Sequence, residues 1–196
     1  MEKVKAISVG GISASIYSDY MLVIPPPNEV KEMIRKYKLS CAKVIGHYDG
    51  MHSIAHISVT GQHRQMPVTM GQKLDCYQRA LIRLKPIELN INGFGNFMHG
   101  SSGATIYAKI EMNTEVNRWF EQLKRVFGDR KTIVPHITIA KNIPLYAFKA
   151  LWPHFVNREY RERFVPDRLT TLTRPTFYTE GEFWRVFKEL HFTKIV

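Results

Sequence analysis

Apolar and polar residues follow two different rhythms along the chain, and these predict helices and strands in turn. Apolar residues spaced three or four apart are typical of one face of a helix, whereas short apolar runs and alternation are typical of strands. The predicted helices cover residues 29–38, 69–84, 114–127 and 145–155. The predicted strands cover residues 20–24, 56–60, 87–91, 104–112, 136–140, 163–172 and 187–195. Helices and strands therefore alternate, with hairpins between some of the strands.

Capping residues and helix breakers set the predicted boundaries. Asn28, Thr69 and Thr114 are each placed to cap the N-terminus of a helix. Pro86 and Gly128 stop the second and third helices, because proline lacks an amide donor and glycine readily adopts the left-handed conformation that ends a helix. Loops are then expected over residues 39–53, 61–66 and 93–103, the last of which is a glycine-rich hairpin.

The composition is that of an ordinary globular chain. With 196 residues, of which 44% are apolar or aromatic, the chain can bury one good core. No apolar run approaches the roughly 20 residues needed to cross a bilayer, and residues 1–12 lack the apolar stretch of a secretory signal. We therefore expect one cytoplasmic domain over residues 1–196 without contact to a membrane, and residues 1–17 as a loosely attached segment. Cys41 and Cys76 have no CxxC spacing and are expected to be reduced thiols.

The chain is strongly basic, with 28 Lys and Arg against 17 Asp and Glu and a net charge of +11. Such an excess favours a polyanionic partner such as RNA, through phosphate contacts and counterion release. Basic residues cluster at Arg158, Arg161 and Arg163, and at Arg130, Lys131 and Lys141, which flank His136. A solubilising excess spread over the helix faces is the alternative, and the sequence leaves it open.

A short internal repeat carries the candidate chemistry. Residues 54–60, Ile-Ala-His-Ile-Ser-Val-Thr, align without gaps on residues 134–140, Val-Pro-His-Ile-Thr-Ile-Ala. Each copy is preceded by a helix and a loop, and followed by a polar turn and a helix. We therefore expect two similar units to form one site between them.

The bare pattern His-x-Ser/Thr is weak evidence, because four of the eight histidines show it. In a strand, the histidine and the residue two positions later share one face, while the residues at plus one and plus three face the core. His56 and His136 fit this arrangement, since isoleucine or valine occupies both inward positions. His99 lies among glycines in a predicted turn, and His191 has Lys194 at plus three, so we take both as structural or incidental.

Two histidines on matched strands suit the cleavage of a phosphodiester. Cleavage needs a base to take a proton from the attacking oxygen and an acid to give a proton to the leaving oxygen. Histidine, with an ordinary pKa of about 6.5, can fill either role near neutral pH. A hydroxyl group on the same strand face can donate to a non-bridging phosphate oxygen and stabilise the developing charge. Such a mechanism requires no metal ion.

The paired motifs resemble those of the 2H phosphoesterase superfamily, the 2′-5′ RNA ligase-like group named after two His-x-Thr/Ser motifs. The resemblance covers residues 18–193: residues 20–29, Tyr-Met-Leu-Val-Ile-Pro-Pro-Pro-Asn-Glu, look like the opening strand and helix of the family, and residues 135–140 look like its second motif. The resemblance implies a two-lobed α+β fold with antiparallel sheets related by a pseudo-twofold axis. Both histidines are then expected in the central cleft between the lobes.

The same resemblance implies a reaction class without naming the substrate. The family includes cyclic phosphodiesterases, 2′-5′ oligonucleotide phosphodiesterases, an RNA-trimming exonuclease and enzymes assayed as ligases. The first motif has Ser58 where threonine is commoner in the family, which keeps the hydroxyl donor but loses the methyl group that helps to fix the rotamer. The second motif ends in Ala140 where a hydroxyl residue is often found, which removes a donor and leaves the substrate more open.

The leading hypothesis is a metal-independent phosphodiesterase acting on RNA or nucleotide substrates. These are 2′,3′-cyclic phosphate ends, 2′-5′ linkages or nucleotide cyclic phosphates, with 2′-5′ RNA ligation as the reverse reaction. His56 and His136 are the expected acid and base, in an order that the sequence leaves open. The expected phosphate ligands are Ser58, Thr138 and, more weakly supported, Lys141. No cofactor, metal ion or obligate protein partner is expected, and the protein is expected to be a monomer.

Two other functions remain as alternatives. One is an RNA-binding module that keeps the cleft without catalysis. The other is a metal-dependent hydrolase that uses His47, Asp49, His52 and His56 as ligands. This spacing needs a helix to converge on one ion, and Gly50 together with the strand at His56 interrupts any such helix.

Aromatic residues give a further and weaker indication. Tyr107, Tyr178 and Trp184 lie on or near predicted strands, where a nucleobase could stack on them. Packing within the core is the more ordinary role for such residues, and we favour it.

Overall fold

A computed structural model describes residues 16–129, 134–177 and 183–193, in which strands and helices alternate as the sequence predicts. The strands are β1 (Ser18–Ile24), β2 (Ile57–Gln65), β3 (Leu89–Met98), β4 (Ala104–Ile110), β5 (His136–Ile143), β6 (Arg161–Phe164), β7 (Arg168–Pro175) and β8 (Arg185–His191). The helices are α1 (Asn28–Ile45), α2 (Pro67–Leu81), α3 (Thr114–Phe127) and α4 (Leu145–Leu151), with short 3₁₀ segments at Gly100–Ser102 and Trp152–His154.

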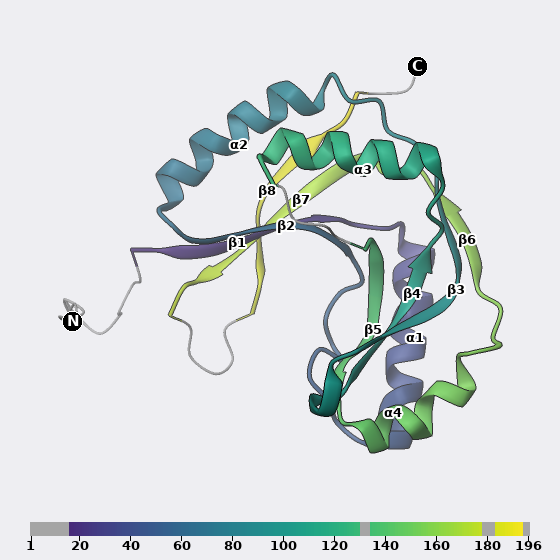
Figure 1. Ribbon diagram of the computed structural model, residues 1–196. Helices are drawn as coiled ribbons and strands as arrows, with labels where there is room; N and C mark the ends of the chain where they lie inside the picture. The colour runs from purple at the N-terminus through teal and green to yellow at the C-terminus, as the bar shows by residue number, and fades with distance from the viewer. Residues whose placement is uncertain (1–15, 130–133, 178–182, 194–196) are drawn as a thin grey trace.

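The described strands form one antiparallel sheet in the order β6-β3-β4-β5-β2-β1-β7-β8. Figure 1 shows that the sheet has two halves of different direction, β6-β3-β4-β5 and β2-β1-β7-β8, which meet between β5 and β2. Within each half, neighbouring strands pair over several residues. Between the halves, the described residues pair at one position, Ile57 with Ile137. The sheet is therefore opened at its centre, where the two histidine motifs lie.

The helices cover the two halves in an exchanged manner. Helix α1 follows β1 along the chain but contacts β5 and α4 of the other half, and α4 contacts β4. Helix α3 follows β4 but contacts β2 and α2, and α2 contacts β8. In Figure 1, α2 and α3 accordingly lie over one half and α1 and α4 over the other. The predicted two-lobed α+β fold with antiparallel strands is confirmed, and the sheets of its two lobes are joined into one.

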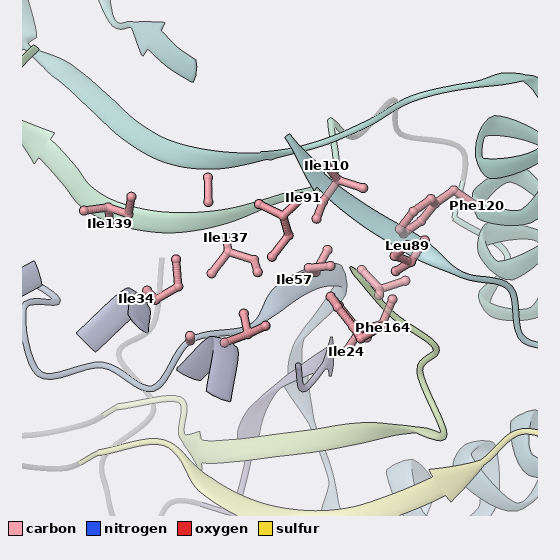
Figure 2. Close-up of a cluster of buried hydrophobic side chains, with 14 of the residues drawn as sticks. Ile24, Ile34, Ile57, Leu89, Ile91, Ile110, Phe120, Ile137, Ile139 and Phe164 are labelled. Carbon is pink, nitrogen blue, oxygen red and sulfur yellow. The ribbon is translucent and has the colours of Figure 1, made fainter. Parts of the chain in front are cut away.

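The core runs beneath the junction of the two halves. Ile57 and Ile137 are fully buried, and Figure 2 shows them in one apolar cluster with Ile34 of α1 and Ile91 of β3. Burying a branched aliphatic side chain contributes about 1.5–3 kcal/mol. The inward isoleucines of the two motifs therefore fix the direction of the residues on either side of them, because side chains alternate between the faces of a strand.

Helix α1 is longer than predicted. It begins at Asn28, with Pro27 at the cap position and no side-chain cap, and it continues to Ile45, through residues expected to form a loop. Buried Cys41 lies one helical turn after Tyr37 and extends the apolar face that starts at Val30. The polar residues Ser40 and Lys43 are exposed on the other face of the same helix, so the segment is polar enough to suggest a loop.

The cap residues of helices α2 and α3 also differ from the predicted ones. Helix α2 begins at Pro67, because proline is well suited to the first helical turn, so Thr69 lies inside the helix. Helix α3 begins at Thr114 as predicted, but its cap is Asn113, whose Oδ1 accepts a hydrogen bond from the Val116 amide at 2.8 Å. Its end at Gly128, in the left-handed conformation with φ 66°, is as predicted.

Strands β2 and β3 extend into segments that were predicted as loops. Residues 61–65 are polar, yet they pair with β1 as far as Gln65 opposite Ser18. Strand β3 runs through its glycines to Met98, with a bulge at Gly93, where φ is 68°. In the first segment, pairing with the distant strand β1 outweighs a local composition that favours turns, and in the second the hairpin of β3 with β4 is longer than its glycines suggest.

The C-terminal elements differ from the prediction in their bounds, and one predicted strand is divided. The expected strand over residues 163–172 is two strands, β6 and β7, with Pro166 in the break between them. Helix α4 ends at Leu151 and continues as the 3₁₀ turn that contains Pro153. Strand β8 begins at Arg185 and ends at His191, before the predicted limit.

Candidate active site

The register between β2 and β5 brings the two motifs together on one face of the sheet. Because Ile57 pairs with Ile137 in antiparallel fashion, His56 lies across from Thr138 and Ser58 lies across from His136. The two histidines are therefore diagonal neighbours, a relation that places residues about 7–8 Å apart. Four residues from segments far apart in the sequence thus form one compact group, which we call the quartet.

Both imidazoles are oriented by the same local hydrogen bond. Nδ1 of His56 lies 2.8 Å from the carbonyl oxygen of Ile54, and Nδ1 of His136 lies 2.6 Å from that of Val134. A carbonyl oxygen can only accept, so Nδ1 carries the proton in each ring. The Nε2 atom is then left to take a proton in the neutral ring or to give one in the charged ring. The repeat thereby presents two equivalent groups for proton transfer.

The surroundings of the pair favour the neutral rings. Burial lowers the pKa of both histidines below the ordinary value, against the opposing effect of the hydrogen bonds to Ile54 and Val134. The charges of Lys38, His136 and Lys141 lower the pKa of His56 further. Once one imidazole takes a proton, the other is therefore less able to do so. The pair can hold a single proton, and that is the state that an acid and a base acting together require.

The two hydroxyl residues differ in exposure. Ser58 is exposed, and its Oγ lies 3.8 Å from Sδ of Met21, which is a weak acceptor. Thr138 is half-buried, beside Tyr107 on β4. The Ser58 hydroxyl can therefore turn towards a stronger acceptor, such as a phosphate oxygen, at little cost.

Aromatic rings enclose His136 on the side of β4 and β3. The centroids of Phe97 and Tyr107 lie 5.1 and 5.0 Å from that of His136, and the two rings stack on each other at 4.4 Å. Tyr107 pairs with Gly95, where an added Cβ would come within 2.6 Å of the tyrosine ring. Glycine is thus required at position 95 so that the tyrosine can lie flat over β3. Tyr107, one of the three aromatic candidates, therefore packs beside the quartet.

The remaining predicted basic residues are distributed unevenly. Lys141 is exposed on β5, close enough for its charge to lower the pKa of His56, and its neighbours Arg130 and Lys131 lie outside the described residues. The second cluster does not reach the quartet. Its members contact other groups: Arg158 lies over the Tyr37 ring, and Arg161 and Arg163 on the outer strand β6 pair with Glu159 and Glu88.

The other candidate sites do not assemble. The rings of His47 and His52 are 6.3 Å apart, and the described part of the chain gathers no group of three side chains suited to a metal ion. His99 contacts the Thr105 hydroxyl at 2.9 Å, in keeping with a structural role. Trp184 packs under Arg174, while Tyr178 lies outside the described residues. None of the described helices is both long and apolar enough to cross a bilayer.

One residue near the quartet was missed in the sequence. Lys38 on α1 has only 2% of its side chain area exposed, and its Nζ donates to Gly50 O, Ser53 O and Ser53 Oγ at 3.1, 2.8 and 2.7 Å. A signal was present, since Lys38 stands four residues after Ile34, on the apolar face of the helix. The acceptors that satisfy it come from the next connection, and nothing in the local pattern identifies them.

The chain is similar to known proteins in its sequence family and in its fold. The family model described as the 2′-5′ RNA ligase superfamily matches residues 25–176. Similar solved structures include TT0787 of Thermus thermophilus, with a TM-score of 0.65, 15% identity and coverage of 88% of this chain and 97% of that one. They also include Escherichia coli LigT with NADP+ (TM-score 0.62, 14% identity) and with 3′-AMP (0.62, 10%), each covering 91% of this chain and 99% of LigT. A search of curated protein sequences found no match. At these identities, the solved structures show a shared fold.

Proposed function

The chain belongs to the 2′-5′ RNA ligase superfamily, and from this premise we propose that it is a metal-independent phosphodiesterase acting on RNA or nucleotide substrates. The observation that carries the proposal is the quartet: His56, Ser58, His136 and Thr138 share one face at the Ile57–Ile137 pairing. A binding module has no need of two imidazoles whose Nδ1 atoms are held by the same type of carbonyl contact.

The proposed reaction uses both imidazoles in one displacement at phosphorus. Nε2 of one histidine takes a proton from the attacking oxygen of water or a sugar hydroxyl, and that oxygen forms a bond to phosphorus. The bond from phosphorus to the leaving oxygen breaks, and this oxygen takes the proton held by Nε2 of the other histidine. The proton count is unchanged, because the two histidines have exchanged protonation states.

The other residues of the site would bind the phosphate. The hydroxyls of Ser58 and Thr138 would donate to the non-bridging oxygens, whose negative charge grows in the transition state. Lys141 would add a positive charge nearby, consistent with its influence on His56. The Ser58 hydroxyl faces the weak acceptor Met21 Sδ, so its turn towards a phosphate oxygen would require little reorganisation.

We propose 2′,3′-cyclic phosphate ends, 2′-5′ linkages or nucleotide cyclic phosphates as substrates. The net charge of +11 supports a polyanion, and LigT, which shares the fold, has been solved in complex with NADP+ and with 3′-AMP. Because the two histidines exchange roles in the reverse direction, 2′-5′ ligation is the expected back reaction. The quartet comes from one chain, so we propose that a monomer without an obligate protein partner suffices.

Single and double alanine variants test the proposal. His56→Ala and His136→Ala should each lower kcat on 2′,3′-cyclic nucleotides by about 10²–10⁴-fold, because each removes an acid or a base. The double variant should be little worse than either single variant, since the two groups act as a unit. His52→Ala, an exposed histidine of the same connection, is the matched control. Substantial turnover in either single variant would refute the two-histidine mechanism.

The RNA-binding alternative predicts a different result. The positive charge favours it, as it favours any polyanion. RNA affinity that falls steeply with salt, with no product from cyclic phosphates or 2′-5′ oligomers, would support binding alone. Turnover that persists unchanged in EDTA would instead separate the proposed mechanism from a metal-dependent one.

A further inference from the structure

We propose that Lys38 is a positioning residue for His56: its ammonium group holds the Gly50–Ser53 turn, which in turn fixes the carbonyl group that orients the imidazole. The proposal rests on the proposed function for its kinetic readout, and on geometry alone for its spectroscopic readout. Lys38 itself is not part of the quartet. It acts through the connection between α1 and β2, which runs back along α1 (Figure 1).

The three donors of the ammonium group are all used within one turn. Nζ of Lys38 donates to Gly50 O and to both Ser53 O and Ser53 Oγ, at 2.7 to 3.1 Å. The Ser53 hydroxyl donates in turn to Gly50 O at 2.7 Å. The turn has little other internal bonding of its own: the Ser53 amide donates to Gly50 O at 3.0 Å. A residue on a rigid helix therefore sets the conformation of this exposed turn.

The turn leads directly to the hydrogen-bond acceptor of His56. Ser53 is followed by Ile54, whose carbonyl oxygen accepts from Nδ1 of His56 at 2.8 Å. Ile54 is itself exposed to 74%, so packing does little to hold it. The position of this carbonyl therefore depends on the anchored residue before it, and the direction of Nε2 depends on this carbonyl.

The charge of Lys38 also has a function that a neutral side chain could not supply. The ammonium group of Lys38 donates to neutral oxygen atoms. Burial lowers the pKa of Lys38 to about 8, so the ammonium form still predominates at neutral pH. Lys124 offers a contrast among buried lysines, because it pairs with the carboxylate of Glu121 at 2.6 Å. The ammonium group contacts no carboxylate within the described part of the chain, and its charge lowers the pKa of His56, as do the charges of His136 and Lys141.

The experiment compares Lys38→Met with Lys36→Met, which makes the same charge change on the exposed side of α1. NMR titration of the histidine ring nitrogens should show a higher pKa for His56 in Lys38→Met, and a larger share of the Nε2-protonated tautomer. The pH profile of turnover should move to higher pH, and kcat should fall by about 10- to 100-fold, the scale expected for a displaced catalytic group. Lys36→Met should resemble the wild-type protein in all three measurements.

A second variant keeps the test decisive if Lys38→Met does not fold. Ser53→Ala leaves the lysine and its charge in place, but removes one acceptor and the hydroxyl bond to Gly50. It should lower kcat about fivefold, as expected for one hydrogen bond, shift the His56 tautomer and leave the His56 pKa nearly unchanged. An unchanged tautomer and kcat in this variant would overturn the proposal.

The outcomes separate this inference from the proposed function. If the wild-type protein cleaves no phosphodiester, the proposed function fails, while the His56 titration still tests Lys38. If the protein is active but His56 has the same pKa and tautomer in Lys38→Met as in the wild type, the lysine is merely structural and the inference fails. A loss of thermal stability without a change at His56 would lead to that same conclusion.

Discussion

The two histidine motifs share one backbone geometry and differ in what supports them. In each, Nδ1 is held by the carbonyl two residues earlier, and an isoleucine anchors the strand in the core. Beyond His56 lie a buried lysine and a polar turn. Beside His136 lie the stacked rings of Phe97 and Tyr107. A duplicated sequence thus fixes the direction of the two imidazoles, and the non-duplicated surroundings make them chemically different.

The difference concerns how each pKa is lowered. Around His136, the effect comes from burial, to which the neighbouring rings contribute by excluding water. Around His56, burial acts together with positive charges, of which Lys38 has the largest effect. Two equal imidazoles would share a proton without preference, whereas unequal surroundings can assign the acid and base roles. Variants of the hydroxyl groups and of the aromatic support, and the pH profile, test this difference between the two motifs.

After the histidines themselves, the largest effect is expected from the hydroxyl groups of Ser58 and Thr138. Ser58→Ala and Thr138→Ala should each lower kcat by about 10²–10³-fold, the usual result of removing a donor to a developing oxyanion. Thr138 is less exposed than Ser58, so its donor acts in a less aqueous setting and its loss should have the larger effect. Ser58→Thr, which keeps the hydroxyl donor, is the matched control and should remain near the wild-type rate. Alanine variants with normal kcat would show that these hydroxyls do not bind phosphate.

A smaller effect is expected from the aromatic support of His136. Gly95→Ala places a methyl group 2.6 Å from the Tyr107 ring, so the ring must move against His136 or away from it. Overpacking of this kind costs about 1–3 kcal/mol in the free energy of unfolding, and kcat should fall with it. Gly71→Ala, in a helix position with no atom near the added methyl group, should be neutral or stabilising. Equal behaviour of the two variants in denaturant titrations would contradict the close contact.

The smallest effect is a displacement of the pH profile. Burial lowers the pKa of both histidines, so the pair should lose its shared proton below the ordinary histidine pKa of about 6.5. The proposed mechanism requires one proton on the pair, so the profile of kcat/KM should be bell-shaped, with its maximum on the acidic side of that value. A maximum well above 6.5, or a profile without an alkaline limb, would contradict the assigned direction of the shifts.

The features that the sequence predicted well are those set by local periodicity. Helix α3, with Trp119, Phe120 and Phe127 on one face, and the alternation around His56 and His136 are legible from neighbouring residues alone. The strand pairing of residues 61–65 was missed because it depends on β1, far back along the chain, and that of Gly95 because glycines favour a turn at a point where the hairpin with β4 continues.

In the candidate site, too, local patterns could be predicted from the sequence, whereas contacts between separate segments could not. The two motifs could be picked out by their repeat, but the register that places His56 across from Thr138 depends on the single Ile57–Ile137 pairing. Lys38 was missed for a related reason: a charge on an apolar helix face looks unfavourable until the carbonyl groups that satisfy it are known.

The central prediction is that one phosphate group contacts both His56 and His136 at once. The test is a titration of the protein with inorganic phosphate, in which the NMR signals of the histidine rings are recorded. We expect His56 and His136 to shift together with one dissociation constant, whereas His47 and His99, which lie outside the quartet, should not shift. A shift at one of the pair without the other, or an equal shift at all four, would contradict a shared phosphate site.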